Sequence, residues 1–385
     1  MATMDRLELT RRLIGHHSVS SESSRPIADW ASNILADAGF KIEQHVYHIN
    51  DVEKVNVVAV KGGEGIPLLA FAGHLDTVPF KEGEWKSDPL AFIERDGKYF
   101  GRGTCDMKGF IGLAMDVGIR IPASELKRPF GLIFTSDEEV GCIGARRLGE
   151  KFSEIATHVV IGEPTSLVPY NLHKGYIYLR VWLRGRGGHS SEPHKGANTA
   201  MLALPEVLRR LNELRDDLSQ VRDERFAVPF ATLNVGLVTT NEKASAKNII
   251  PKECRIELDV RPLPGQDVYE IVQAIKKHIA PDGQVNGVQV EVQLARKPTP
   301  PFDTPPDAPI VQAVERVFGT KAASTSFNTE GPIFTRMGCS CVICGLGSIE
   351  QAHQPDEFVD AKFFSDDVAR KYEDLVRQFC CSETT

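Results

Sequence analysis

The sequence lacks a hydrophobic run long enough to cross a membrane, because no stretch approaches the roughly 18 apolar residues that a spanning helix needs. Its first twenty residues, MATMDRLELTRRLIGHHSVS, are amphipathic and charged, without the continuous apolar segment of a secretory signal. These absences predict a protein without a membrane partner and favour a cytoplasmic location.

Blocks of five or six like charges are also missing. The chain has 45 Lys and Arg against 52 Asp and Glu, a net charge of −7 and a pI near 5.9. A nucleic-acid-binding protein needs a concentrated basic surface to neutralise phosphates. The charge balance therefore predicts no nucleic-acid partner.

Cysteine is sparse, with eight residues in 385, which excludes a disulfide scaffold. Cys339, Cys341 and Cys344 cluster in CSCVIC, but no second Cys or His pair has the spacing of a structural zinc site. We interpret them as small residues of a buried strand. No G-x-S-x-G nucleophile motif is present, and no G-x-G-x-x-G opens a helix after a strand, which argues against a nucleotide-binding α/β protein.

Apolar runs alternate with helical patterns through the first 170 residues. Examples are the strand-like PLLAFAG, RPFGLIFT and HVVIG, and the amphipathic segments at 26–38 and 110–121. This order predicts an α/β fold with a mainly parallel, doubly wound sheet, whose chemistry collects at the carboxyl ends of the strands.

The pattern changes near residue 174, where GYIYLRVWLRGRGG alternates apolar and polar residues as an antiparallel strand with one buried face does. Helical patterns at 198–214 and 268–278 and further alternating strands follow, up to the Pro-rich KPTPPFDTPPD. We expect a catalytic domain of residues 1–173 and 297–385, with a ferredoxin-like α+β domain inserted at 174–296.

Potential ligands follow strand after strand of the predicted α/β domain. Taken singly, each has a simpler explanation, since a His-x-Asp turn is more often a satisfied histidine and an acid before a helix is often a cap. Together they form the donor set of a site for one or two zinc ions, in which an aspartate can bridge two metals. The candidates are His74, Asp106, Glu138, Glu139, Glu163 and His353.

The motifs GHLDTVP, GRGTCDMKG, DEEVGCIGAR, GEPT, GGHSSEP and AHQPDEF resemble those of the dizinc aminoacylase and carboxypeptidase family over nearly the whole chain. The resemblance implies two Zn²⁺ per subunit, with Co²⁺ as a possible substitute, and hydrolysis of an N-acyl amino acid. It implies that His74 and Glu163 bind one zinc, that Glu139 and His353 bind the other, and that Asp106 bridges them. Asp76 would orient His74, and Glu138 would be the general base.

The same resemblance implies roles for four further residues. His189 would stabilise the tetrahedral oxyanion from the inserted domain of a partner subunit, so a homodimer through that domain is expected. Asn248 and Arg261 would hold the substrate carboxylate, for which a guanidinium fork is suited. Gly331 would let the backbone approach the substrate.

Other interpretations stay open. Another N-acyl amino acid or a dipeptide could be the substrate, and a metal-free binding protein could use the same scaffold. Cys105 and Cys142 are interpreted as packing or loop residues beside the site. His173 and Lys174 are left without a role.

Overall fold

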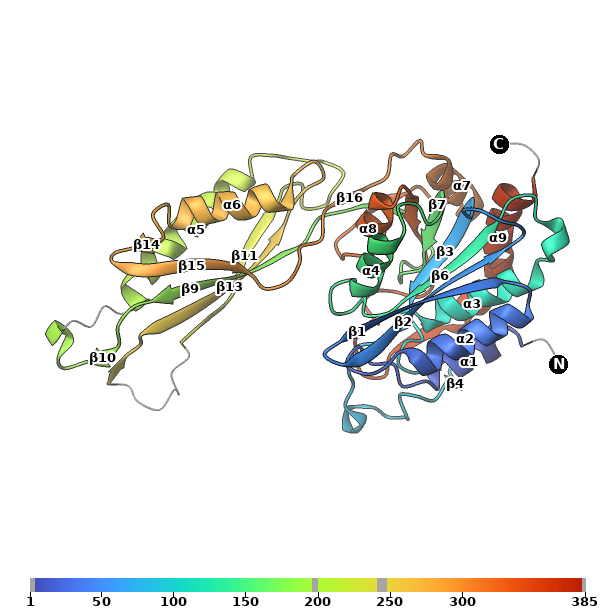
Figure 1. Ribbon diagram of the computed structural model, residues 1–385, viewed down its shortest axis with the longest axis horizontal. Coiled ribbons are helices and arrows are strands. Elements are labelled where there is room, and N and C mark those ends of the chain that lie inside the picture. The colour runs from blue at the N-terminus through green and yellow to red at the C-terminus, as the bar shows by residue number, and fades with distance from the viewer. Residues whose placement is uncertain (1–3, 196–199, 241–247, 383–385) are drawn as a thin grey trace. The chain divides into compact units, whose positions relative to one another are not determined.

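The structure is a computed structural model, which describes residues 4–195, 200–240 and 248–382 (Figure 1). Its contacts divide the chain into two compact units. The first comprises Met1–Asn171, Thr304–Ala323 and Thr329–Thr385, and the second comprises Leu172–Asp303 and Ser324–Asn328.

The largest sheet, most of whose strands belong to the first unit, is mixed and has the strand order β1-β2-β6-β3-β7-β18-β8-β16, with β17 paired to β8. The four central strands β6, β3, β7 and β18 are parallel, whereas β1, β2 and β8 pair antiparallel at the edges. β8 and β16 lie where the chain passes between the units. The strands are β1 (Lys41–Ile49), β2 (Val52–Lys61), β3 (Leu69–His74), β6 (Phe130–Thr135), β7 (His158–Ile161), β8 (Tyr170–His173), β16 (Phe302–Asp303), β17 (Ala323–Thr325) and β18 (Ser340–Ile343).

Helices α1, α2, α3, α7 and α9 share one hydrophobic core with one face of this sheet. Phe71 lies in that core, in edge-on contact with Phe110, Phe130 and Tyr372. Figure 1 shows α4 and α8 on the side of the sheet away from α1, α2 and α3. The helices are α1 (Arg6–Ile14), α2 (Arg25–Asp37), α3 (Lys108–Arg120), α4 (Ile143–Lys151), α7 (Pro309–Phe318), α8 (Gly331–Arg336) and α9 (Asp366–Val376).

A second, three-stranded sheet in this unit joins distant parts of the sequence. β19 (Phe358–Asp360) pairs with β5 (Lys98–Phe100), which pairs with β4 (Ile93–Arg95). This pairing holds the segment before α3 against the segment that follows His353. Because β3, β6 and β7 are parallel neighbours, the loops after them meet at the same edge of the main sheet.

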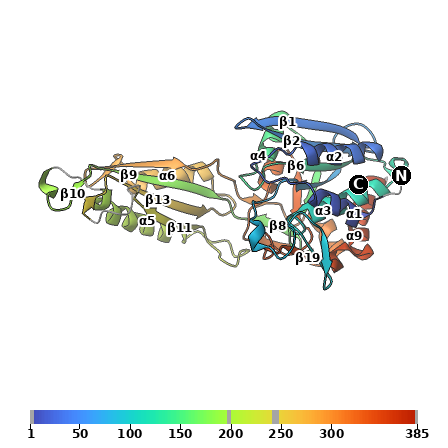
Figure 2. The same ribbon diagram turned by 90° about the horizontal axis from the view of Figure 1, so that it is seen from below.

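The second unit has a five-stranded antiparallel sheet of order β11-β13-β9-β15-β14. Buried and half-buried residues alternate along β9 and β13, and the buried side chains share a core with α5 and α6. Figure 2 shows the strands and helices of this unit from a second direction. The elements are β9 (Ile177–Arg184), β10 (Gly188–His189), α5 (Leu204–Leu218), β11 (Thr232–Thr239), β12 (Ile249–Ile250), β13 (Glu253–Arg261), α6 (Val268–Ile279), β14 (Gln284–Val285) and β15 (Val288–Leu294).

The predicted α/β fold is confirmed, and the order β9-α5-β11-β13-α6-β15 is the ferredoxin-like arrangement expected for the insertion. The compact second unit begins at Leu172 and ends at Asp303, whereas the sequence placed it at 174–296. It also takes up Ser324–Asn328, which the sequence did not indicate. The helix expected at 198–214 is α5, Leu204–Leu218, and residues 198 and 199 lie outside the described part.

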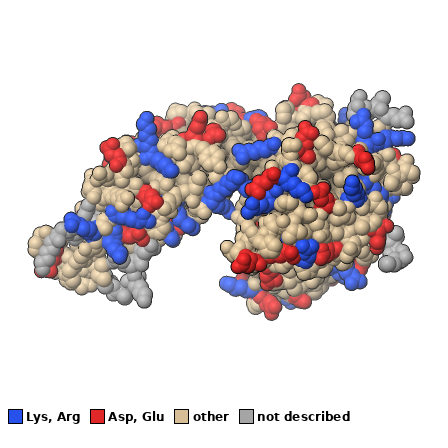
Figure 3. All heavy atoms as spheres, viewed as in Figure 1, with Lys and Arg blue, Asp and Glu red and all other residues tan. Residues whose placement is uncertain are grey.

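None of the helices in the described residues combines the length and apolarity required to span a membrane. On the face seen in Figure 3, basic and acidic side chains are interspersed over both units.

We expect His173 to make the stability of the folded chain depend on pH. Its ring is fully buried beside Phe302, and Nδ1 lies 2.8 Å from the carbonyl oxygen of Lys174. Burial, with a smaller contribution from the charge of Arg261, lowers the pKa of His173 to about 4. Below pH 6.5, His173 is therefore protonated in the unfolded chain but stays neutral in the folded chain. As a result, the free energy of unfolding decreases as the pH drops from 6.5 towards 4.

We expect His173→Gln to be less acid-sensitive than the wild type. Between pH 6.5 and pH 4, the free energy of unfolding of the wild type should fall relative to that of the variant by about 1.4 kcal/mol for each pH unit. Denaturant unfolding of both proteins at pH 7.5 and 5 measures it. An equal loss of stability in both would contradict the assignment to His173.

Candidate metal centre

His74 ends the central strand β3, and its ring is fixed from one side. Nδ1 lies 2.9 Å from the main-chain oxygen of Asp76, which leaves Nε2 facing the loops after the neighbouring strands. The carboxylate of Asp76 is farther away, with Oδ1 3.6 Å from Nδ1. The strand stops at His74, so Asp76 has turned out of the extended geometry in which alternate side chains share a side.

The carboxylate of Asp76 instead fastens the loop that follows β6. It accepts hydrogen bonds from the amides of Glu138 (3.1 Å) and Glu139 (3.3 Å) and from the hydroxyl of Ser20 (2.7 Å). In the structure, therefore, Asp76 supports His74 through its backbone and the two glutamates through its side chain.

Asp106 lies between two imidazoles. Its Oδ1 is 3.0 Å from Nε2 of His74, and its Oδ2 is 3.1 Å from Nε2 of His353. Asp106 is 5% exposed, and its peptide bond to Met107 is cis. Each oxygen thus faces a different histidine, as the sequence-predicted bridging role requires.

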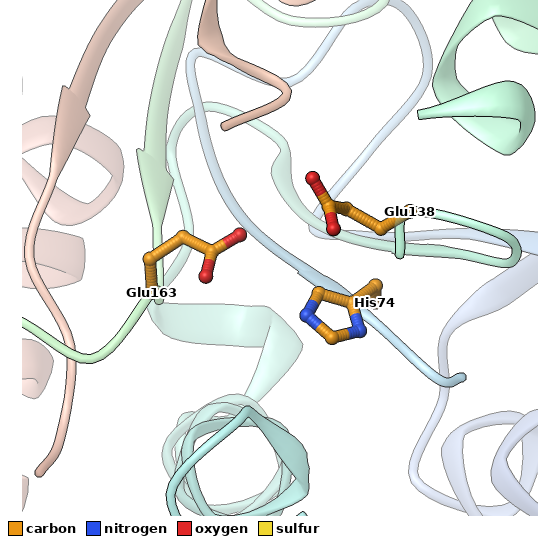
Figure 4. Close-up of side chains that lie close together, drawn as sticks. All are labelled: His74, Glu138 and Glu163. Atoms are coloured by element: carbon orange, nitrogen blue, oxygen red, sulfur yellow. The ribbon is translucent and has the colours of Figure 1, made fainter. Parts of the chain in front are cut away.

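Glu138 and Glu139 diverge from one tight turn. Asp137 has φ 59°, and its buried carboxylate is 2.8 Å from the ammonium of Lys54. This ion pair to β2 fixes the position of the turn. Oε1 of Glu139 lies 3.0 Å from Nε2 of His353. Glu138 points towards His74 and Glu163 (Figure 4), whereas Glu139 groups with His74 and Asp106 and also contacts His353.

Glu163 follows β7 and completes the cluster. Figure 4 shows the carboxylates of Glu138 and Glu163 converging on the ring of His74. One potential ligand atom from each of these three residues lies within 4.8 Å of the others, and the same holds for His74, Asp106 and Glu139. All six residues that the sequence singled out are therefore brought together, and Glu138 is as close to His74 as a ligand would be.

The electrostatics of this cluster are those of a site built for cations. Burial raises the pKa of Glu138 to about 8 and also raises the pKa of Glu139 and Glu163, where neighbouring carboxylates add to the effect. Hydrogen bonds to Asp106 and Glu139 raise the pKa of His353 to about 10. Within the described residues, the ion-pair partners of Asp106 and Glu139 are histidines.

This donor set fits divalent metal ions. Two imidazole nitrogens and four carboxylates are ligands that zinc accepts, and a cation would relieve the repulsion between buried acids. Without a metal ion, bound protons reduce this repulsion, and the raised pKa values of the glutamates reflect that proton binding.

Glu163→Gln should stabilise the metal-free protein. Because the folded pKa of Glu163 is raised, metal-free wild type loses stability as pH rises above the ordinary glutamate value of 4.5. The amide removes this cost, about 1.4 kcal/mol for each pKa unit relieved. Unfolding of both proteins in chelator at pH 8 and pH 4 measures it, with the gain confined to pH 8. A variant less stable than wild type at pH 8 would contradict the repulsion argument.

In the second unit, two of the predicted residues lie side by side. β10 pairs with β12, and Nε2 of His189 is 2.9 Å from Nδ2 of Asn248. Nδ1 of the same ring lies 2.6 Å from the hydroxyl of Ser191. Both His189 and Asn248 are exposed, so they form a polar pair on the surface of this unit.

Arg261 at the end of β13 is already engaged. Its guanidinium makes a two-pronged contact with Asp259, at 2.8 and 3.1 Å, and donates to Oδ1 of Asn328 at 2.6 Å. A substrate carboxylate would have to share it with Asp259. Gly331, in the first unit, is buried at the first position of α8.

Sequence reasoning missed two buried acids. Glu357 accepts hydrogen bonds from Arg102 (2.8 Å) and from the amides of Cys105 (2.9 Å) and Asp106 (3.0 Å), so it holds the loop that positions Asp106. Glu330 accepts from Thr135 (2.8 Å), and burial raises its pKa to about 7. Glu357 lies in the motif AHQPDEF, which was noted for His353, and Glu330 directly precedes Gly331.

Comparisons with known proteins identify the family of this chain. Residues 70–378 match the model of peptidase family M20/M25/M40. The chain is 34% identical to the acetylornithine deacetylase of Proteus mirabilis, over 98% of this chain and 97% of that protein, and 35% identical to that of Pasteurella multocida, over 97% and 98%.

Two solved structures show the same fold. A tripeptidase from Staphylococcus aureus superposes with a TM-score of 0.77 at 20% identity, covering 97% of both chains. A metallo-carboxypeptidase from Sulfolobus solfataricus superposes with a TM-score of 0.74 at 16% identity, covering 96% of this chain and 98% of that one. The chain belongs to peptidase family M20/M25/M40, a family of metal-dependent hydrolases.

Proposed function

We propose that this enzyme removes the acetyl group of N2-acetyl-L-ornithine with two zinc ions, giving L-ornithine and acetate for arginine biosynthesis in the cytoplasm. The observation that carries the proposal is the carboxylate of Asp106 between the rings of His74 and His353. Support for the substrate comes from full-length relatives named acetylornithine deacetylase. Cobalt is an alternative metal for the same ligands.

The first unit supplies the ligands and the base. His74 and Glu163 would hold one ion, His353 and Glu139 would hold the other, and Asp106 would be a ligand shared by both. When bound, the ions supply Lewis acidity towards the amide carbonyl and the attacking water. Glu138 takes the proton from that water and returns it to the nitrogen of the leaving amine. Asp76 keeps Glu138 in place through its hydrogen bond to the amide of that residue.

The second unit supplies groups for the substrate in this proposal. His189 would donate to the oxyanion of the tetrahedral intermediate, in a homodimer formed through the inserted unit. Asn248 and Arg261 would bind the α-carboxylate, and Arg261 would exchange part of its contact with Asp259 for the substrate. Gly331 would give the substrate room beside the backbone.

A substrate panel tests the proposal. It compares N2-acetyl-L-ornithine, N-acetylcitrulline, N-acetylmethionine and N-succinyl-diaminopimelate on the zinc-loaded enzyme. We expect kcat/KM for N2-acetyl-L-ornithine to exceed the others by about tenfold or more, the discrimination that about 1.4 kcal/mol of differential binding gives. A higher value for another compound would establish the alternative, a different N-acyl amino acid deacylase or dipeptidase.

A further inference from the structure

The turn that carries Glu138 closes through Cys142. The amides of Gly141 and Cys142 donate to the main-chain oxygen of Glu138 at 2.9 and 2.8 Å. Sγ of Cys142 lies 3.2 Å from Oε1 of the same glutamate. One residue therefore contacts both the backbone and the carboxylate of Glu138.

The thiol is suited to act as a donor. Cys142 is 4% exposed, and burial, together with the charges of Glu138 and Glu330, raises the pKa of its thiol well above the usual range. A protonated thiol facing an ionised carboxylate can only give its hydrogen to the oxygen, and Glu138 must be ionised to act as the base. The contact is therefore an S–H···O hydrogen bond from Cys142 to Glu138.

Local structure alone does not account for a cysteine here. Cys142 has φ 54° and ψ 40°, a left-handed conformation in which glycine or asparagine is favoured. It stands at the N-cap of α4, yet its side chain makes no capping hydrogen bond. The side chain is directed instead at the carboxylate of Glu138.

We propose that Cys142 is a positioning residue for the reaction, which fixes one oxygen of the Glu138 carboxylate so that the other can take and return the proton. This inference rests on the proposed role of Glu138 as the base. It does not depend on which N-acyl amino acid is the substrate. A carboxylate that can rotate freely spends less time aligned with the water, and small errors of alignment cost large factors in rate.

Steady-state kinetics of Cys142→Ala and Cys142→Ser provide the test, with the N-acyl amino acid that wild type hydrolyses best. The alanine variant should lose about tenfold in kcat with KM and metal content unchanged, whereas the serine variant, whose hydroxyl can still donate, should recover most of kcat. Cys381→Ala is the matched control, because Cys381 is a half-buried thiol near the C-terminus, and it should behave as wild type. Wild-type kcat in Cys142→Ala, or equal losses in both Cys142 variants, would overturn the proposal.

The S–H stretching band gives a readout without turnover. The band that disappears in Cys142→Ser should have the lowered frequency of a hydrogen-bonded thiol in wild type and should shift upwards in Glu138→Ala. Should the Cys142 variants fail to fold, the comparison of wild type with Glu138→Ala decides alone, and an unchanged spectrum overturns the hydrogen bond. Wild-type turnover in Glu138→Ala contradicts the proposed function, whereas an inactive Glu138→Ala beside a fully active Cys142→Ala contradicts only this inference.

Discussion

Glu138→Ala should bind metal as the wild type does and lose between about 10²- and 10⁴-fold in kcat, the range that general acid–base catalysis contributes. The carboxylate lies beside His74 and Glu163, where it is placed to take a proton from the attacking water and to return it to the leaving nitrogen. KM should change little, because the side chain acts on the water and the leaving nitrogen. Steady-state kinetics and metal analysis of the purified variant measure both quantities.

Glu138→Gln is the control for this prediction. It keeps the size and the hydrogen-bonding oxygen of the side chain but cannot take a proton, so it should be as slow as the alanine variant. Because Glu138 is as close to His74 as a ligand is, a loss of bound metal in both variants would instead make it a ligand. Retained activity in either variant would reject it as the base.

Asp106→Asn should have the second large effect. Asp106 is the carboxylate that faces both histidines, so its replacement weakens both metal positions and not one. We expect at least about a 10³-fold loss of activity together with reduced metal content, since the amide lacks the charge that offsets two cations. Calorimetric titration of the metal-free wild type and variant with Zn²⁺ measures the affinities of the metal positions.

Asp116→Asn is a matched control for Asp106→Asn. Asp116 is also a buried aspartate, and it pairs with Arg6 of α1 and Arg120 of α3, not with residues of the metal cluster. This variant should keep full metal content and turnover even if it lowers stability. Normal metal binding by Asp106→Asn would contradict the bridging role.

Much of the metal cluster could be predicted because its members follow strands. His74, Glu138 and Glu163 come directly after apolar runs, and parallel strands deliver such residues to one edge of a sheet. The inserted α+β unit could be predicted because continuous apolar runs give way to a strict alternation of apolar and polar residues, and this change is visible in the sequence itself.

The contacts that orient these residues could not be predicted from the sequence pattern. Glu357 holds the loop of Asp106 from 251 positions away, through main-chain amides that any residue type provides. Asp76 contacts His74 with its backbone, and a sequence pattern identifies side chains only. The thiol of Cys142 reaches Glu138 because of a left-handed turn, which the pattern DEEVGC does not reveal by itself.

Metal content tests the central claim most directly. Wild-type protein, purified without chelator and measured by elemental analysis, should contain about two divalent ions per chain, and His353→Ala should contain about one. Equal content in wild type and His353→Ala would contradict the division of ligands. A wild-type protein that neither contains nor takes up divalent metal would contradict the account as a whole.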